Sequence, residues 1–382
     1  MENLLYFILV SIIAFTFAAF SIPQIVRVSK AKKLFDEPNS RKSSTAITPT
    51  LGGTAIFIGL TLGVTLGGDG FPFFDLKYIF ASLLITFFAG LKDDLVGISP
   101  RSKLGALVIS LAVVILFANL RLSSVYGCFG IDKIGYLPSI LLSFFVGIVI
   151  INSFNLIDGI DGLASSIAVQ ISTVFGIWFV IIGLPEYALI SFSLAGACLA
   201  FFIFNVFGHR NKIFMGDTGS LLIGTLIFVL AAKFNEFNAG YTGEYVLKSV
   251  PAVLIGFMVY PLFDVLRVFL LRIFVAKKSP FKPDKNHIHH RLLTLGMSHL
   301  QATGVIFVNN ILFMAGSLIL QKYLNVIELT SVILGVSILL STSLELYLLF
   351  KQKIKPGDKY QQLFLPGYVV HKANEFTFRK QH

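Results

Sequence analysis

Two adjacent aspartates end one of the most apolar stretches of this 382-residue chain. Asp93 and Asp94 close the sequence FASLLITFFAGLKDD. Carboxylates in contact repel each other, and one of them takes up a proton unless a cation neutralises the pair. Neighbouring side chains on a helix point about 100° apart, so both cannot face one point equally well. A solvated helix end would explain a single charge. For a pair we expect divided roles, with one carboxylate near a metal ion and the other supporting it or accepting a proton.

A second polar segment, NSFNLIDGIDGLA, places two amides and two carboxylates at steps of three: Asn152, Asn155, Asp158 and Asp161. On a regular helix, steps of three drift by about 60° each, so all four cannot share a face, although Asn155 and Asp158 can. An Asn/Asp/Gly turn between two helices is the structural alternative. The segment begins inside an apolar run, however, where buried amides and carboxylates need partners.

The segment MGDTGS carries Asp217 directly before an apolar run. Taken alone, Asp217 reads as a plain helix N-cap. Glycines and hydroxyl groups at a helix N-terminus also suit a bound phosphate group.

The segment HIHHRLL carries His287, His289, His290 and Arg291. His287 and His290 are three residues apart and can face one side of a helix. Neither a cysteine set nor HExxH spacing accompanies them, so a zinc site is disfavoured. Histidine beside arginine fits phosphate oxygens better, the alternative being a solvated basic loop.

Several carboxylates without cysteine ligands favour a hard cation such as Mg²⁺, with Mn²⁺ as the alternative. A hard cation next to histidine, arginine and glycine-rich turns predicts a phosphate or diphosphate ligand.

The elements that position these residues are apolar helices. The chain is 55% hydrophobic, only 13% charged, and has a mean hydropathy of +0.81, which calls for lipid as its solvent. We predict an all-α, polytopic integral membrane protein with about 11 transmembrane helices. The candidate spans lie near residues 4–22, 50–67, 76–91, 104–120, 136–154, 163–182, 187–207, 219–232, 249–270, 301–320 and 327–350.

Basic residues gather on one set of alternating loops. All but six of the 31 lie there, the exceptions being Lys77, Arg121, Lys133, Lys233, Lys248 and Lys322. The positive-inside rule then places the N-terminus outside and the C-terminus in the cytoplasm. The net charge of +11 therefore reports topology, and nucleic-acid binding is excluded. The polar motifs fall at cytoplasmic helix ends. We expect a transmembrane domain over residues 1–350 and a basic cytoplasmic tail over 351–382.

Taken in order, the motifs resemble those of the bacterial polyprenyl-phosphate N-acetylhexosamine-1-phosphate transferases, the superfamily of the phospho-MurNAc-pentapeptide translocase. The resemblance runs from about residue 36 to residue 291. It rests on DEPNSRK followed by TPTLGG, then KDDLVG, NLIDGIDGLA, FMGDTGS and SPFKPDKNHIHHRL. HIHHRL is similar to the branch used for O-antigen, enterobacterial common antigen or teichoic acid, rather than to the peptidoglycan translocase.

The resemblance implies that a UDP-N-acetylhexosamine, by default UDP-GlcNAc, donates its sugar 1-phosphate to undecaprenyl phosphate and releases UMP. This Mg²⁺-dependent step would initiate a cell-surface polysaccharide on the cytoplasmic face of the bacterial inner membrane; a homodimer is left open. The implied catalytic carboxylates are Asp93, Asp94, Asp158 and Asp161. The implied metal ligands are Asp217, Asp93, Asp94 and Asn155. The implied substrate-binding residues are Asp36, Arg41, Lys42, Asn155, His287, His289, His290 and Arg291.

Three other functions are weighed. A membrane transporter also carries carboxylates, but they should lie in mid-membrane and on facing repeats, whereas these lie at helix ends. A lipid-diphosphate phosphatase would use histidine, arginine and aspartate but release inorganic phosphate. The phospho-MurNAc-pentapeptide transferase is the nearest alternative within the superfamily, and HIHHRL argues against it.

Overall fold

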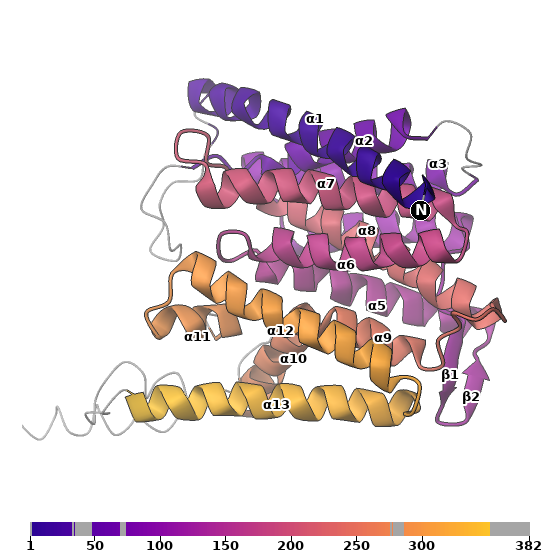
Figure 1. Cartoon of the computed structure of the whole chain (residues 1–382). Coiled ribbons are helices and arrows are strands. Elements are labelled where there is room, and N and C mark those ends of the chain that lie inside the picture. Colours follow the sequence, from indigo (N-terminus) through magenta and orange to yellow (C-terminus); the bar gives the residue numbers. More distant parts are fainter. Residues whose placement is uncertain are drawn as a thin grey trace, which may run out of the picture.

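The described chain is a bundle of helices, most of which lie side by side along one direction (Figure 1). The computed structural model describes residues 2–32, 34, 48–68, 74–275, 277 and 286–351. The helices are α1 (Glu2–Lys32), α2 (Gly52–Leu66), α3 (Leu76–Val96), α4 (Pro100–Ala112), α5 (Tyr136–Ile157), α6 (Leu163–Ile181), α7 (Pro185–Phe207), α8 (Gly216–Gly240), α9 (Val250–Phe257), α10 (Val259–Leu270), α11 (Ile288–Thr294), α12 (His299–Leu320) and α13 (Val326–Lys351). Two π-helical turns, η1 (Val113–Phe117) and η2 (Leu271–Val275), continue α4 and α10.

Every apolar segment predicted to span the membrane is helical. Among the described residues, eight helices are long and apolar enough to cross a membrane, and the bent pair α9–α10 makes a ninth candidate. The chain is therefore a polytopic integral membrane protein. The count of eleven stays a prediction, because α2 has only 15 residues and α3 ends on charged residues. The start of α1 and the end of α13 lie at opposite ends of the bundle (Figure 1).

The span predicted over 249–270 is broken rather than continuous. Its two halves, α9 and α10, meet at Met258 with a bend of 84°. Pro261 explains the break, because proline has no N–H to donate to the carbonyl four residues earlier. That carbonyl belongs to Phe257, and the side-chain amide of Asn310 on α12 donates to it instead at 3.1 Å. A polar partner for the freed carbonyl is what an apolar surrounding requires.

A two-stranded antiparallel sheet interrupts the helices between α4 and α5. The strands β1 (Ser124–Cys128) and β2 (Ile131–Lys133) turn through Gly130, which has a φ of 78°. The carboxylate of Glu236 on α8 accepts a hydrogen bond from the backbone N–H of Ser123 at 2.6 Å. The all-α prediction named no strand here, because two short strands, one of them held at its start by a side chain from a distant helix, leave little local pattern.

Helix α8 is the centre of the bundle. All of its residues from Thr218 to Ala232 are buried. Glycines allow its first turn to be approached closely. A Cβ on Gly53 of α2 would collide with the backbone of Gly219, and a Cβ on Gly90 of α3 would collide with the backbone of Thr218. On the sides of α2 and α3, the first turn of α8 is therefore approached closely by the backbones of these two helices.

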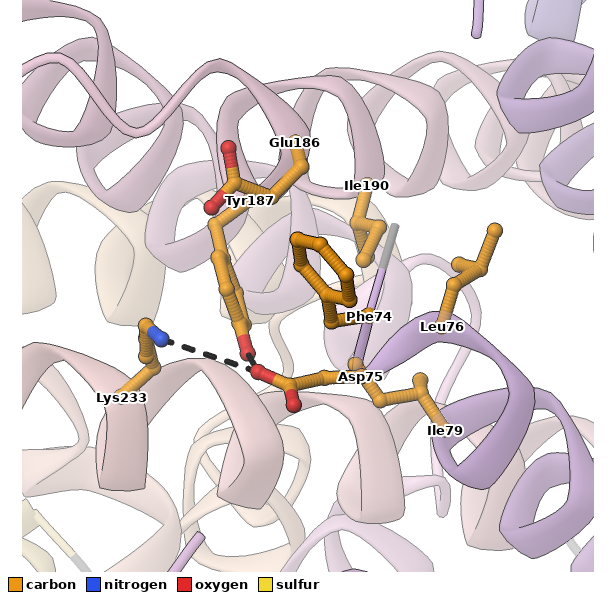
Figure 2. Close-up of a pocket in the computed structure, with 8 residues that line it drawn as sticks. All are labelled: Phe74, Asp75, Leu76, Ile79, Glu186, Tyr187, Ile190 and Lys233. Atoms are coloured by element: carbon orange, nitrogen blue, oxygen red, sulfur yellow. Dashed lines mark hydrogen bonds and ion pairs between the residues drawn. The ribbon is translucent and has the colours of Figure 1, made fainter. Parts of the chain in front are cut away.

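At the far end of the bundle a charged cluster joins α3, α7 and α8 (Figure 2). The carboxylate of Asp75 accepts a hydrogen bond from the Tyr187 hydroxyl at 2.7 Å, and the Lys233 ammonium lies 3.7 Å away. These groups line a cavity of about 140 Å³ together with apolar side chains such as Phe74 and Ile190. The cluster ties down the end of the bundle that carries none of the predicted catalytic motifs.

Gly53→Ala tests the close approach at the start of α8. We expect it to lower the free energy of unfolding by about 1–3 kcal/mol or more, because the added methyl group meets backbone that cannot move aside. Thermal unfolding in detergent measures the change. Gly304→Ala is the matched control, since a Cβ there meets no atom within 4 Å. Equal unfolding midpoints for the two variants would contradict the close approach at the start of α8.

Candidate active site

Asp94 on α3 caps the N-terminus of α8. Its carboxylate oxygens accept hydrogen bonds from the backbone N–H groups of Asp217 at 2.8 Å and Thr218 at 2.9 Å. The Thr218 hydroxyl donates to the same carboxylate at 2.5 Å. The first N–H groups of a helix have no partner within the helix. A negative charge there is also attracted by the positive end of the helix dipole. Asp94 thus fixes the position of Asp217.

Lys103 links two of the predicted metal ligands. Its ammonium lies 3.2 Å from the Asp93 carboxylate and 2.9 Å from the Asp217 carboxylate. The other Asp93 oxygen accepts a hydrogen bond from the backbone N–H of Ile98 at 2.9 Å, just beyond the end of α3. The adjacent aspartates therefore face different partners, Asp94 the start of α8 and Asp93 Lys103, while their predicted roles at a metal ion stay predictions.

Asn155 near the end of α5 completes the contacts of Asp217. Its side-chain N–H group donates to the Asp217 carboxylate and, at 2.9 Å, to the Ser220 hydroxyl. Asn152, three residues earlier, instead donates to the carbonyl of Ile148 in its own helix. The prediction that the four polar residues of this segment do not share one face is confirmed.

Asp158 follows α5 and has no cationic partner among the described residues. Within the described part of the chain, no side chain donates a hydrogen bond to its carboxylate or forms an ion pair with it. Burial, followed by the negative charges of Asp217 and Asp94, raises the pKa of Asp158 well above its ordinary value. In the described part of the site, the carboxyl groups outnumber the one ammonium group, that of Lys103, and a bound cation would favour the ionised form of Asp158.

Asp161 is held in a different way, by a lysine and a histidine from distant elements. Lys212 before α8 lies 2.7 Å from its carboxylate, and Nδ1 of His299 on α12 lies 3.1 Å from the same oxygen. Burial by itself would raise the pKa of Asp161, but the hydrogen bonds from His299 and Lys212 outweigh it and lower that pKa below its ordinary value. Asp161 therefore fixes the turn between α5 and α6.

Residues 286–291, here called the histidine segment, are anchored to α10. Nδ1 of His287 lies 2.8 Å from the Asp264 carboxylate, whose other oxygen accepts a hydrogen bond from the backbone N–H of Ile288 at 2.8 Å. Both His287 and Asp264 are buried. The first histidine of the segment is therefore a structural anchor.

His289 connects the histidine segment to the turn after α5. Its Nδ1 lies 3.0 Å from the Tyr260 hydroxyl on α10, while its Nε2 is buried and has no hydrogen-bond partner in the part of the chain that the structure describes. A Cβ on Gly159, next to Asp158, would press against this Nε2 atom. Burial lowers the pKa of His289 to about 3, so its ring is neutral near pH 7. A neutral ring with one open nitrogen is suited to hydrogen bonding with a ligand.

The structure brings most of the predicted residues to one end of the bundle. Asp93, Asp94, Asn155, Asp158 and Asp217 form the carboxylate site around the start of α8. His289 adjoins it through Gly159, and the His290 ring packs on the His289 ring with centroids 4.3 Å apart. Asp36, Arg41 and Lys42 lie outside the described residues, as does the predicted tail beyond residue 351, and their roles stay predictions.

Sequence reasoning missed several residues of this region: Lys103, Lys212, Asp264, His299 and Glu345. Asp264 and Glu345 had a usable signal, because an ionisable residue within an apolar span usually has a function or a specific partner. The three basic residues had none, since their partners are far away in the sequence and basic residues are common on these loops.

The described side chains do not form a complete metal site by themselves. Within the described residues, no three His, Cys, Asp or Glu side chains converge closely enough to hold a metal ion by themselves. Mg²⁺ commonly uses only one or two carboxylates, with water and substrate phosphates as its other ligands. The unpaired Asp158 carboxylate and the neighbouring Asp217 fit that second arrangement.

Fold and site together define a polytopic membrane protein with a carboxylate-rich site, flanked by histidines, at one end of its helices. The family model described as "Glycosyl transferase family 4" matches residues 76–235, from α3 into α8. These residues carry the Asp93–Asp94 pair, the Asn155–Asp161 turn and Asp217.

Curated relatives extend the match beyond that region. An Escherichia coli O157:H7 protein named "Undecaprenyl-phosphate alpha-N-acetylglucosaminyl 1-phosphate transferase" is 32% identical over 286 residues, 72% of this chain and 73% of its own. The "Decaprenyl-phosphate N-acetylglucosaminephosphotransferase" of Mycolicibacterium smegmatis is 31% identical over 71% of each chain. A Bacillus subtilis protein named "Probable undecaprenyl-phosphate N-acetylglucosaminyl 1-phosphate transferase" is 28% identical over 94% of this chain and 97% of its own. The chain belongs to the family of polyprenyl-phosphate N-acetylhexosamine-1-phosphate transferases.

Asp94→Ala tests the cap on α8. We expect the free energy of unfolding to fall by about 2–3 kcal/mol, because two backbone N–H groups and a hydroxyl lose a charged acceptor. Asp94→Asn keeps one acceptor oxygen and should fall between the parent and the alanine variant. Thermal unfolding in detergent gives the order. Asp132→Ala, on the exposed strand β2, is the control, and an Asp94→Ala variant as stable as that control would disprove the cap.

Lys212→Met tests the ion pair at Asp161. We expect a loss of about 1 kcal/mol in the free energy of unfolding near neutral pH, the size of a partly exposed pair. Because the pKa of Asp161 is lowered in the folded protein, its contribution is full above the ordinary aspartate pKa of about 4 and is lost as the pH falls through the folded value. Urea unfolding at several pH values measures this, and the gap between parent and variant should close in acid. A gap that widens in acid contradicts the assignment.

Proposed function

We propose that the chain transfers N-acetylglucosamine 1-phosphate from UDP-N-acetylglucosamine to undecaprenyl phosphate and releases UMP. The observation that carries this proposal is the Asp158 carboxylate near Asp217, which has no ion-pair partner among the described residues and whose pKa is raised by burial and then by the neighbouring carboxylates. Such a site calls for a cation and a phosphate ligand, and it lies where helices of a membrane bundle end. The names of the curated relatives supply the sugar and the lipid class.

The reaction exchanges one phosphoanhydride bond for another. An oxygen of the lipid phosphate forms a bond to the phosphorus that carries the sugar. The bond from that phosphorus to the oxygen of UMP breaks, and UMP leaves with the electron pair. A phosphate monoester is largely ionised near pH 7, so the attacking oxygen needs little help from a base. The residues therefore act mainly by positioning the reactants and balancing their charge.

Mg²⁺ is the cation that we propose, with Asp217 and Asp158 as its protein ligands and Asp93 beside them. When bound, it would neutralise developing negative charge on the diphosphate. Asp94 keeps Asp217 in place through the α8 backbone, and Asn155 orients the Asp217 carboxylate.

Two nearby groups suit the substrates. The His289 ring is neutral near pH 7. Its Nε2 has no hydrogen-bond partner among the described residues, and in the tautomer that carries the proton there it can donate a hydrogen bond to the sugar or the diphosphate. The Lys103 ammonium pairs with Asp93 and Asp217, and it can form an ion pair with a phosphate oxygen instead when substrate binds.

We place this site on the cytoplasmic side of the bacterial inner membrane, with the N-terminus outside and the C-terminus inside. The distribution of Lys and Arg among the loops supports this orientation. The opposite positions of the start of α1 and the end of α13 agree with an odd number of crossings (Figure 1). A cytoplasmic site would have direct access to a soluble nucleotide sugar.

Purified protein in detergent, given undecaprenyl phosphate, Mg²⁺ and UDP-GlcNAc, should release UMP, and excess EDTA should stop the release. Asp217→Asn should lower the rate at least about 100-fold while leaving the thermal midpoint close to that of the parent. Asp132→Asn, the same substitution at an exposed site, is the control. UMP release that resists EDTA removes the metal from the proposal. Release only with UDP-MurNAc-pentapeptide, or release of inorganic phosphate instead, replaces the proposed reaction.

A further inference from the structure

Helix α13 carries an acidic residue near the end of its apolar span. The side chain of Glu345 is only 15% exposed and lies within the membrane-span candidate Val326–Leu348. An ionisable group in such a place is costly unless it is paired. Among the described residues, Glu345 has two ion-pair partners, and both are arginines from other helices.

Those arginines join three helices around one carboxylate oxygen. Nη2 of Arg267 on α10 donates to Oε1 of Glu345 at 2.5 Å, and Nε of Arg291 on α11 lies 3.3 Å from the same atom. The arginine side chains are 9% and 4% exposed. With Asp264, 3.9 Å from Arg267, the cluster holds two positive and two negative charges. A buried cluster with balanced charge and short contacts is the form in which such groups are tolerated.

The same arginines hold the start of the histidine segment. Nη1 of Arg267 donates to the backbone carbonyl of Asn286 at 2.7 Å, and Nη2 of Arg291 donates to the side-chain oxygen of Asn286 at 3.1 Å. Asn286 immediately precedes His287, which is anchored on Asp264. The backbone of residues 286–291 is thus fixed from α10 on one side and, through the arginines, from α13 on the other.

From this geometry we propose that Glu345 is a positioning residue for substrate binding. By holding Arg267 and Arg291, it keeps the histidine segment in the register that directs Nε2 of His289 toward Gly159 and the carboxylate site. Helix α13 lies beyond the region matched by the family model, which ends at residue 235, yet this contact makes it part of the site. We call the contacts among Glu345, Arg267, Arg291 and Asn286 the clamp. The kinetic consequence of the inference rests on the proposed function, whereas the clamp itself does not.

Two variants test the clamp. Glu345→Gln keeps the shape but removes the negative charge that Arg267 and Arg291 share at Glu345. The double variant Glu345→Leu/Arg267→Met removes one charge of each sign and fills the space with apolar groups, an exchange that buried ion pairs often tolerate without loss of stability. Glu328→Gln is the matched control on α13, because Glu328 caps the exposed first turn of that helix, far from the clamp.

Steady-state UMP release should show KM for UDP-GlcNAc raised about tenfold in both test variants, with kcat within about twofold of the parent, because the segment is misplaced rather than removed. Hydrogen exchange of the peptide covering residues 287–295 should become faster in both. Glu328→Gln should match the parent in both measurements. A purely structural pair would change the thermal midpoint but not this split between KM and kcat.

The outcomes separate the two proposals. A folded double variant with parental KM and parental exchange overturns the clamp. If the parent releases no UMP with any UDP-sugar, the proposed function fails, and hydrogen exchange alone then decides the clamp: unchanged protection of residues 287–295 rejects it, and lost protection upholds it.

Discussion

The carboxylate of Asp94 holds the first turn of α8, and the geometry of the site depends on this contact. By accepting the N–H groups of Asp217 and Thr218, Asp94 supplies from α3 the cap that α8 does not provide for itself. The positive end of the helix dipole compensates part of the charge that the carboxylates bring together. Gly53 and Gly90 let α2 and α3 approach closely enough for the cap to form. Packing without side chains at these two points therefore determines where Asp217 lies.

An imbalance of charge distinguishes the reactive part of the site from its support. Asp94, Asp161 and Asp264 each have hydrogen-bond donors from the protein and hold backbone or loops in place. Asp158 has none among the described residues, and Lys103 is shared between two carboxylates. The groups left without full compensation are the ones suited to a cation and a diphosphate. A shared end of the helix bundle keeps these groups together.

The histidine segment divides its residues in the same way. His287 is an anchor, whereas His289 presents an open nitrogen next to Gly159. The sequence predicted that several histidines beside arginine bind phosphate, but it gave equal weight to every member. Which histidine forms the hydrogen bond with Asp264 depends on the rotation of the segment relative to α10. In our proposal that rotation is set by Arg267, Arg291 and Glu345, which contact one another although they are far apart along the chain.

Composition and motif order by themselves determined the membrane class, the helical segments and the family to which the chain belongs. Those properties follow from local hydrophobicity and from runs of adjacent residues, which can be recognised without knowing which helices pack against each other. Only the tertiary structure decided that Asp94 caps α8 while Asp93 faces Lys103, that Pro261 breaks a span whose freed carbonyl is taken by Asn310, and that α13 reaches the site through Glu345. These are contacts between residues distant in sequence. The energy of a buried charge or an unpaired carbonyl depends on its partners in space, and the folded arrangement alone specifies them.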